Sequence, residues 1–168
     1  MIYEEGFKGI KLHPYYQDFD LDEERLTPIY ENAERYGLVT VLHTGFDIAY
    51  PRIRKAEPAR IAGVVSRFPK LKFVATHLGG WEDWDAVEKH ILGKSVHMET
   101  SFSIMHLGEE RARDMMLRHP ADRVLFGTDS PWMGQKETLE AVRALGLGRE
   151  RERKMLSGNA GALLGLQS

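Results

Sequence analysis

The sequence predicts an α/β protein of the parallel (β/α)8 barrel type, and three segments lead to this prediction. Residues 39–45, 73–80 and 124–132 each begin with an apolar run rich in Val, Leu and Phe and end in a turn that contains glycine. Short apolar runs bounded in this way are typical of buried strands. Each run also leads into a side chain that can bind a metal: His43, His77 or Asp129. The C-terminal ends of parallel strands meet at one rim of a barrel, so we expect these side chains to lie together.

Two more strands and a set of helices complete the alternation. Residues 6–14 and 95–101 are the additional predicted strands. Apolar spacing and helix-ending residues predict helices over residues 27–37, 58–67, 84–92, 109–118, 137–145 and 149–156. Thr27 is expected to cap the first helix, with Pro28 at its first position and Gly37 at its end. Strands that alternate with helices of this length indicate repeated βα units and a parallel sheet.

The spacing of the polar residues is close to one βα unit. His13 and His43 are 30 residues apart, His43 and His77 are 34 apart, and Asp129 follows 52 residues later, which leaves room for two units. A strand, a helix and their loops need about 30 residues. No Gly-x-Gly-x-x-Gly or Walker-type lysine loop follows a strand, which disfavours nucleotide-binding folds. We therefore predict one domain over residues 1–168, an incomplete TIM-type barrel of about five βα units.

The composition restricts the function classes. The 23 basic and 25 acidic residues nearly balance, which gives no indication of binding to nucleic acid or to an anionic membrane. The absence of cysteine excludes disulfides and thiolate chemistry. No apolar run approaches the roughly 20 residues that a membrane-spanning helix needs, and no secretory leader pattern opens the chain. We expect a cytoplasmic protein.

These motifs together resemble the amidohydrolase superfamily. The resemblance rests on His43 at the end of one strand, on His77 followed by Gly-Gly at the end of the next, and on the Gly-Thr-Asp-Ser-Pro-Trp turn at residues 127–132. The closing segment, residues 156–166, is similar to the last helix of the amidohydrolase-related branch, which includes 2-amino-3-carboxymuconate-6-semialdehyde decarboxylase. The resemblance covers essentially the whole chain.

The resemblance implies roles for individual residues. The family barrel has eight strands, of which these five resemble strands four to eight. His43 would be a metal ligand, and His77 either a second ligand or the catalytic histidine of the decarboxylases. Asp129 would bind the metal and accept a proton from its water. Lys11 and His13, two apart on one strand, point to the same face, and either could approach the metal. The implied cofactor is a divalent metal, with zinc expected and manganese or iron as alternatives.

One departure from the family pattern is large. The first strand of the family carries a His-x-His pair that supplies two metal ligands, and this sequence contains no His-x-His. About three βα units and half of the metal shell are therefore unmatched. Three explanations remain open: a fragment, a partial barrel completed by another subunit, or a chain that has lost its activity. Exposed strand edges favour self-association, so we expect a homo-oligomer or completion by the missing N-terminal strands.

The predicted substrate is a small molecule, with a carboxylate as one candidate feature. Arg52 and Arg54 lie in the loop after the strand that ends at His43, and arginine pairs well with planar oxyanions. Lys11 and Trp132 are further candidates for substrate binding. A solvated loop face is the alternative interpretation of the two arginines.

Three histidines outside the strands are expected at the surface: His90, His106 and His119.

The sequence thus predicts a metal-dependent hydrolase of the amidohydrolase type that attacks its substrate with a metal-activated water. A metal-dependent decarboxylase of the same branch is the alternative enzyme. A non-catalytic partial barrel that assembles with another chain is the alternative from a different class.

Overall fold

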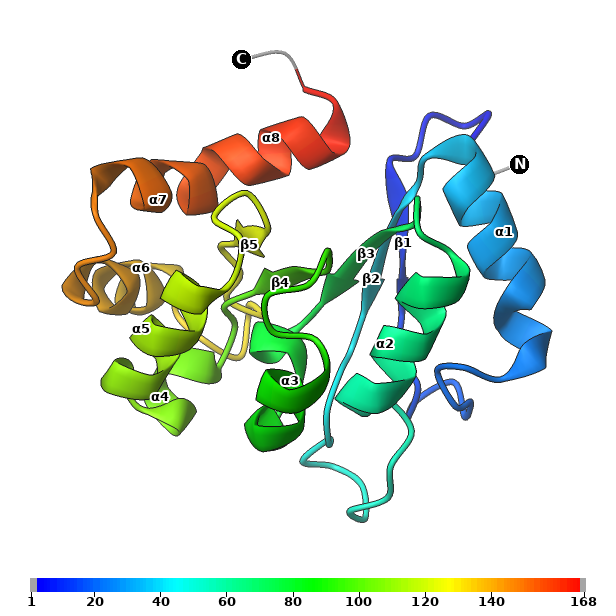
Figure 1. Ribbon diagram of the computed structural model, residues 1–168, viewed down its shortest axis with the longest axis horizontal. Helices are drawn as coiled ribbons and strands as arrows, with labels where there is room; N and C mark the ends of the chain where they lie inside the picture. The colour runs from blue at the N-terminus through cyan, green and yellow to red at the C-terminus, as the bar shows by residue number, and fades with distance from the viewer. Residues whose placement is uncertain (1–2, 167–168) are drawn as a thin grey trace.

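A five-stranded parallel sheet forms the centre of the molecule. The computed structural model describes residues 3–166, and within them the strands are adjacent in chain order (Figure 1). They are β1 (Gly9–Leu12), β2 (Val39–Leu42), β3 (Lys72–Ala75), β4 (His97–Glu99) and β5 (Val124–Leu125). All five predicted strands are present, shorter than their apolar runs, and each pair of neighbours is parallel.

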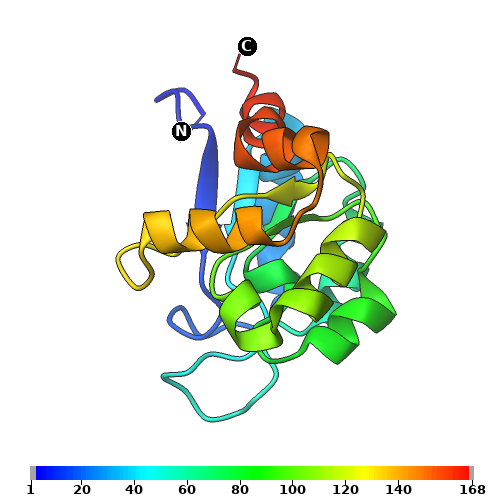
Figure 2. The same ribbon diagram turned by 90° about the vertical axis from the view of Figure 1, so that its left-hand side faces the viewer.

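Helices follow every strand, as the alternation predicts. The helical elements are α1 (Thr27–Tyr36), α2 (Pro58–Arg67), α3 (Trp84–His90), α4 (Ser103–Leu107), α5 (Glu109–Arg118), α6 (Gln135–Ala144), α7 (Arg149–Arg153) and α8 (Asn159–Leu164). Single 3-10 turns span Glu24–Leu26 and His77–Gly79, and a π-helical turn, Lys154–Gly158, joins α7 to α8. In Figures 1 and 2, α1, α2 and α3 line up along one side of the sheet.

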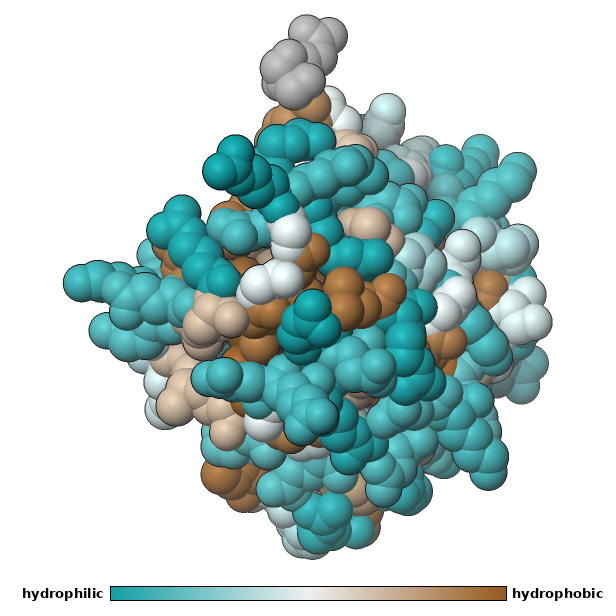
Figure 3. Space-filling model, turned by 60° about the vertical axis from the view of Figure 1, so that its left-hand side comes forward, coloured by the Kyte–Doolittle hydropathy of each residue, from teal (hydrophilic) through white to brown (hydrophobic). Residues whose placement is uncertain are grey.

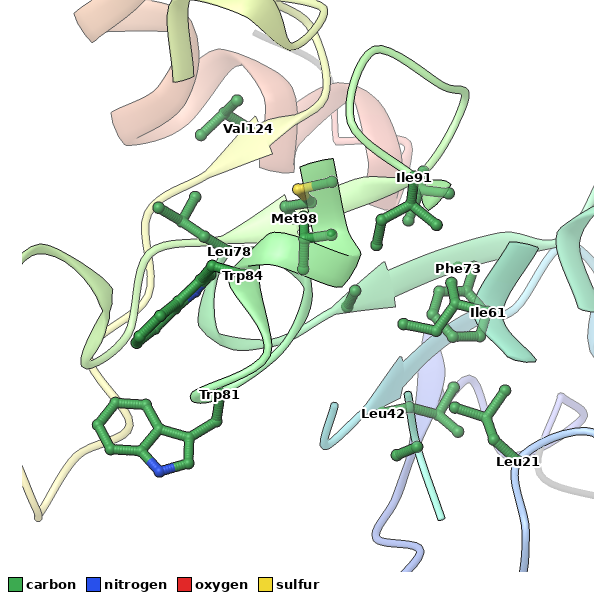
Figure 4. Close-up of a cluster of buried hydrophobic side chains, with 14 of the residues drawn as sticks. Leu21, Leu42, Ile61, Phe73, Leu78, Trp81, Trp84, Ile91, Met98 and Val124 are labelled. Carbon is green, nitrogen blue, oxygen red and sulfur yellow. The ribbon is translucent and has the colours of Figure 1, made fainter. Parts of the chain in front are cut away.

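The main core lies between the sheet and these helices. Phe73 of β3 and Met98 of β4 are both 1% exposed and belong to the same cluster as Ile61 of α2 and Ile91 after α3 (Figure 4). Burying side chains of this size stabilises a fold by about 1.5–3 kcal/mol each. This face of the sheet, which we call the outer face, therefore supplies most of the hydrophobic stabilisation.

The opposite face of the sheet, which we call the inner face, carries a smaller apolar cluster. Val39, Val74 and Leu125, from three different strands, pack against Leu163 of α8. The amino group of Lys72, at the start of β3, donates to the carbonyl oxygen of Leu163 at 2.9 Å. Helix α8 thus covers the N-terminal end of the strands on this face and leaves their C-terminal end to polar residues.

The register of the strands places the candidate site on the inner face. Lys11 is paired with Val41, which packs with the inner cluster, and Glu99 is paired with Leu125 of that cluster. His43 directly follows β2, two residues beyond Val41, and therefore continues the inner side of the alternation. Lys11, His43 and Glu99 therefore share the inner face at the C-terminal half of their strands or just beyond it.

Some local expectations were wrong. Leu26, not Thr27, precedes the first helical residue, because the 3-10 turn before α1 runs directly into the helix. Helix α4 was not predicted. His119 is not at the surface: it is 2% exposed, its Nε2 donates to the carbonyl oxygen of Val96 at 2.8 Å, and its Nδ1 accepts from Gly93 N–H. Burial lowers the pKa of His119, so the neutral ring connects the backbone of Gly93 to that of Val96.

One face of the molecule is mostly hydrophilic. Figure 3 shows this face, with apolar side chains gathered near its middle and surrounded by polar ones. In the part of the chain that the structure describes, every helix is too short or too polar to cross a membrane.

Candidate metal and acid–base site

Two histidines and an aspartate converge at the ends of β1 and β2. His13 follows β1, His43 follows β2, and Asp47 lies four residues further along the loop. One ligand atom from each of the three lies within 4.8 Å of the others. The carboxylate Oδ2 of Asp47 is 3.4 Å from His13 Nε2 and 3.6 Å from His43 Nε2, and the two imidazole rings stack at 4.3 Å between centroids.

His77 adjoins this group at the end of β3. Its Nε2 is 3.2 Å from Nδ1 of His43, and its backbone takes a left-handed φ of 56°. Non-glycine residues adopt this conformation rarely, and it concentrates at functional sites. The indole N–H of Trp84 donates to the carbonyl oxygen of His77 at 3.0 Å, and the His77 ring lies edge-on to Trp81. The ring is therefore fixed by contacts on several sides.

A carboxylate lies behind His77. Glu99, the last residue of β4, accepts hydrogen bonds from the backbone N–H groups of His77 and Ser101, each at 2.8 Å. The hydroxyl of Ser101 lies 2.6 Å from Glu99 Oε1 and 3.0 Å from His77 Nδ1. Ser101 thus connects the carboxylate of Glu99 to the ring of His77.

The environment keeps these imidazoles neutral at pH 7. Burial, with a smaller contribution from the neighbouring His43, lowers the pKa of His77 to about 3. Burial also lowers the pKa of His43, and it lowers that of His13 to about 4. Neutral imidazole is the form that binds a metal. Burial raises the pKa of Glu99, while three hydrogen bonds to the charged carboxylate act against that rise.

Lys11 places a positive charge among these groups. It is solvent-accessible, yet desolvation lowers the pKa of its amine, and Glu99 and Asp129 partly restore it. The positive charge of Lys11 in turn lowers the pKa of His13, His43 and His77. Lys11 therefore acts electrostatically on the whole site.

The two loop arginines are tied to acidic partners. Arg54 forms a two-pronged ion pair with Asp83, and Arg52 pairs with Glu82. Both guanidinium groups also lie over the ring of Phe46, at 4.0 Å for Arg52 and 5.2 Å for Arg54. The arginines thus join the loop after β2 to the segment before α3.

Asp129 and Trp132 follow β5 and are not among the described residues whose ligand atoms converge. Both are exposed, with Trp132 at 78%, and Asp129 has a left-handed φ of 54°. The negative charge of Asp129 still raises the pKa of His43 and Lys11, so its field reaches the site. The structure brings His13, His43 and His77 together and leaves Asp129 at the edge of the group.

Sequence reasoning missed Asp47, Glu99 and Ser101. Asp47 follows His43 by four residues in a loop that was singled out only for its cations. Glu99 and Ser101 close the predicted strand at residues 95–101, where they alternate with Met98 and Thr100. That alternation was an available signal that the two side chains share one face of the sheet.

The donor set fits a divalent cation. Neutral imidazole nitrogens and a carboxylate suit zinc, manganese or iron, and three protein ligands are the number usual in catalytic zinc sites. The carbonyl oxygen of Phe46 lies 2.9 Å from His43 Nε2, close to Asp47. That contact is a hydrogen bond to the carbonyl oxygen, and a cation bound by His43 Nε2 would replace it. The converging ligand atoms of His13, His43 and Asp47 mark the region where a cation would be stabilised.

A family model matches almost the whole sequence and identifies the family of the chain. Residues 1–166 match the family model described as Amidohydrolase. The chain belongs to the amidohydrolase family. This membership agrees with the resemblance inferred from His43, His77 and the turn at residues 127–132.

Several solved structures of other proteins have a fold similar to that of this amidohydrolase family member. An uncharacterized TIM-barrel protein from Bordetella bronchiseptica is 27% identical, with a TM-score of 0.77 over 98% of this chain and 59% of that one. A putative 2-pyrone-4,6-dicarboxylic acid hydrolase from Pseudomonas putida is 22% identical (TM-score 0.72; 99% and 66% covered). A manganese-bound dihydroxybenzoic acid decarboxylase from Polaromonas sp. JS666 is 16% identical (TM-score 0.71; 98% and 63% covered).

These likenesses confirm the barrel prediction and its extent. The five-stranded sheet corresponds to part of a TIM barrel, and the chain spans about 59–64% of the length of the first structures that it matches.

Proposed function

We propose that this chain carries the metal site of an amidohydrolase-type hydrolase that acts on a small carboxylated molecule. The observation that supports the proposal is the convergence of His13, His43 and Asp47 beside the ring of His77. We propose zinc as the metal, with manganese and iron as alternatives for the same ligands. When bound, such a metal supplies Lewis acidity and lowers the pKa of water toward 7.

The surrounding residues supply the acid–base chemistry in this proposal. His77 is neutral at pH 7, since its pKa is about 3, and it is hydrogen-bonded and buried. A neutral, fixed imidazole can accept a proton or orient a polar group of the substrate. Asp129 is the proposed acceptor of the proton from the attacking water, because its charge acts on His43 and it is exposed to solvent.

Recognition of the substrate anion falls mainly to Lys11. Its amine is close enough to influence all three histidines, whereas Arg52 and Arg54 would first have to leave Glu82 and Asp83. We therefore propose Lys11 as the primary partner of a substrate carboxylate, with the two arginines at the margin. Trp132 offers an exposed apolar surface in the turn after β5, and we propose it as a further contact of the substrate.

A decarboxylase is the second candidate. The placement of His77 favours a decarboxylase. His77 is absent from the group of residues whose ligand atoms converge, and it contacts the ring of His43 instead. That placement suits an acid–base histidine better than a second metal ligand. Structures with a similar fold also include proteins named dihydroxybenzoic acid decarboxylase and 2,6-dihydroxybenzoate decarboxylase. Incubation with a carboxylated substrate distinguishes the two activities by release of carbon dioxide or by addition of water across a C–N or C–O bond.

A partial barrel that assembles with further strands is the third candidate. A groove of about 460 Å³ lies between β1 and α1, lined by apolar side chains that include Ile10, Ile29, Tyr36 and Leu38. Sheet edges and apolar grooves of this kind are normally covered. We propose a second copy of the chain, or the strands unmatched in this sequence, as the cover. A homo-oligomer that holds no metal would support this candidate over the two enzymes.

Metal content tests the proposal directly. The chain is loaded with zinc or manganese, dialysed thoroughly, and its metal measured per folded molecule. We expect close to one metal per chain in the wild type and almost none in His43→Ala. His90→Ala, on the last turn of α3, is the matched control and should retain the metal. Folded wild-type protein without metal, or His43→Ala that keeps it, would overturn the proposal.

A further inference from the structure

The carboxylate of Glu99 occupies a position from which it can control His77. It lies at the C-terminal end of β4, and both of its oxygens accept a backbone N–H: Oε1 from His77 and Oε2 from Ser101. Hydrogen bonds from N–H groups favour the charged form of a carboxylate, which can only accept. The hydroxyl of Ser101, 2.6 Å from Oε1, must then use its single hydrogen to donate to Glu99.

The tautomer of His77 follows from that donation. Because the Ser101 hydroxyl donates its single hydrogen to Glu99, its oxygen can only accept from His77 Nδ1, which is 3.0 Å away. The carbonyl oxygen of Ser101, 3.3 Å from the same nitrogen, is also an acceptor. Both neighbours therefore require a hydrogen on Nδ1 of His77. In a neutral imidazole this leaves Nε2 with a lone pair.

The effect continues to the proposed metal ligands. Nε2 of His77 faces Nδ1 of His43 at 3.2 Å, so a lone pair on His77 favours a hydrogen on that nitrogen of His43. Nε2 of His43 also lies 2.9 Å from the carbonyl oxygen of Phe46, an acceptor that favours a hydrogen on that nitrogen. His77 and Phe46 therefore favour opposite tautomers of a neutral His43, and the state of His77 influences which one prevails. Outer hydrogen-bond partners of this kind set the tautomer and orientation of metal-binding histidines.

We propose that Glu99 is a positioning residue that acts through Ser101 to hold His77 in its Nδ1–H tautomer, with the Nε2 lone pair of His77 directed at the proposed metal ligand His43. The part of this inference that concerns metal affinity rests on the proposed function. The part that concerns the tautomer of His77 stands on the hydrogen bonds alone.

The turn after β5 leaves room for this arrangement. A Cβ atom on Gly127 would collide with the carboxylate of Glu99. The hydroxyl of Thr100 donates to the carbonyl oxygen of Gly127 at 3.0 Å and accepts its N–H at 3.1 Å, which holds the turn against β4. A glycine at this position therefore allows the backbone to pass directly over Glu99.

The test is the tautomer of His77, measured by long-range ¹H–¹⁵N NMR on the metal-free, ¹⁵N-labelled chain at pH 7.5. The wild type should show a protonated Nδ1 and an unprotonated Nε2. Glu99→Gln carries an amide that must donate. Where its nitrogen faces Ser101, the hydroxyl must donate to His77 instead, and where its oxygen does, the hydroxyl can still accept. The hydroxyl is then no longer fixed as an acceptor, so the variant should show a mixture of the two tautomers. Its zinc affinity should fall by about 10–100-fold, the usual effect of losing an outer partner.

Controls separate positioning from general damage to the fold. Thr100→Val removes a neighbouring buried hydroxyl of the same strand end and should leave the tautomer of His77 unchanged. If Glu99→Gln does not fold, Ser101→Ala replaces it and should give a mixture of the two tautomers. An Nε2–H tautomer in the wild type, or an unchanged tautomer in the variant that folds, would overturn the inference. Because this readout needs no metal, a chain that binds none would refute the proposed function without touching this result.

Discussion

The two parts of the rim differ in how completely the fold encloses their polar residues. His43 and His77, which we call the buried rim, follow the central strands β2 and β3 and are 8% and 4% exposed. Asp129 and Trp132, the exposed rim, follow β5, which among the described strands pairs only with β4. A residue that follows a central strand receives hydrogen-bond partners from strands on both sides. A residue that follows an edge strand does not, which explains why similar motifs have such different surroundings.

A substitution that adds a side-chain atom beside the buried rim should have the largest effect on stability. Gly45 has a φ of 86°, and a Cβ atom there would collide with the backbone of Trp81. Gly45→Ala should lower the free energy of unfolding by roughly 2–5 kcal/mol, combining overpacking with left-handed strain. Urea denaturation measures this loss.

Gly146→Ala is the matched control for that substitution. Gly146 has a left-handed φ of 60° and open space around it. It therefore isolates the backbone strain, about 1 kcal/mol. Equal losses at the two positions would contradict the view that the buried rim is closely packed.

The pH dependence of stability should also separate the two parts of the rim. The pKa of His77 is lowered to about 3 in the folded protein, so below pH 6.5 the unfolded chain binds the additional proton. The free energy of unfolding of the metal-free chain should therefore be steady above pH 6.5 and fall as the pH drops, with about 2 kcal/mol from His77 by pH 5. Urea titrations between pH 5 and 8 measure the slope.

His77→Phe removes the titrating group and keeps an aromatic ring among Trp81 and Phe102. Its slope below pH 6.5 should be shallower than that of the wild type. Parallel slopes would mean that burial of His77 does not contribute to acid sensitivity.

The buried and exposed rims were not equally accessible to sequence analysis. The apolar runs located all five strands, and the flanking prolines and charges placed α2 and α5 at their observed bounds. Periodicity reports on burial against the sheet, which is a local property of each element. The roles of Asp47 and Glu99 depend on contacts with β1 and β3, segments more than 20 residues away, and no local pattern encodes such contacts. For the same reason His119, held by Gly93 and Val96, was misplaced at the surface.

The smallest expected effect is the loss of zinc affinity when one carboxylate is replaced by an amide. It tests the comparison most sharply, because each part of the rim supplies one candidate carboxylate. Asp47 touches both His13 and His43, whereas Asp129 acts on His43 only through its field. Asp47→Asn should therefore weaken zinc binding by at least about tenfold, since even outer partners contribute that much. Asp129→Asn should change it by less, with stability altered by no more than about 0.5 kcal/mol, as is usual for exposed positions.

Titration calorimetry with zinc measures both variants, and each amide keeps the shape of the side chain that it replaces. A larger loss in Asp129→Asn would mean that the turn after β5 moves inward when metal binds, and that the exposed rim becomes part of the metal shell. A larger loss in Asp47→Asn would mean that the buried rim supplies the carboxylate itself. Asp129 would then be available as the proton acceptor, a role in which solvent exposure is an advantage because the proton must leave the site.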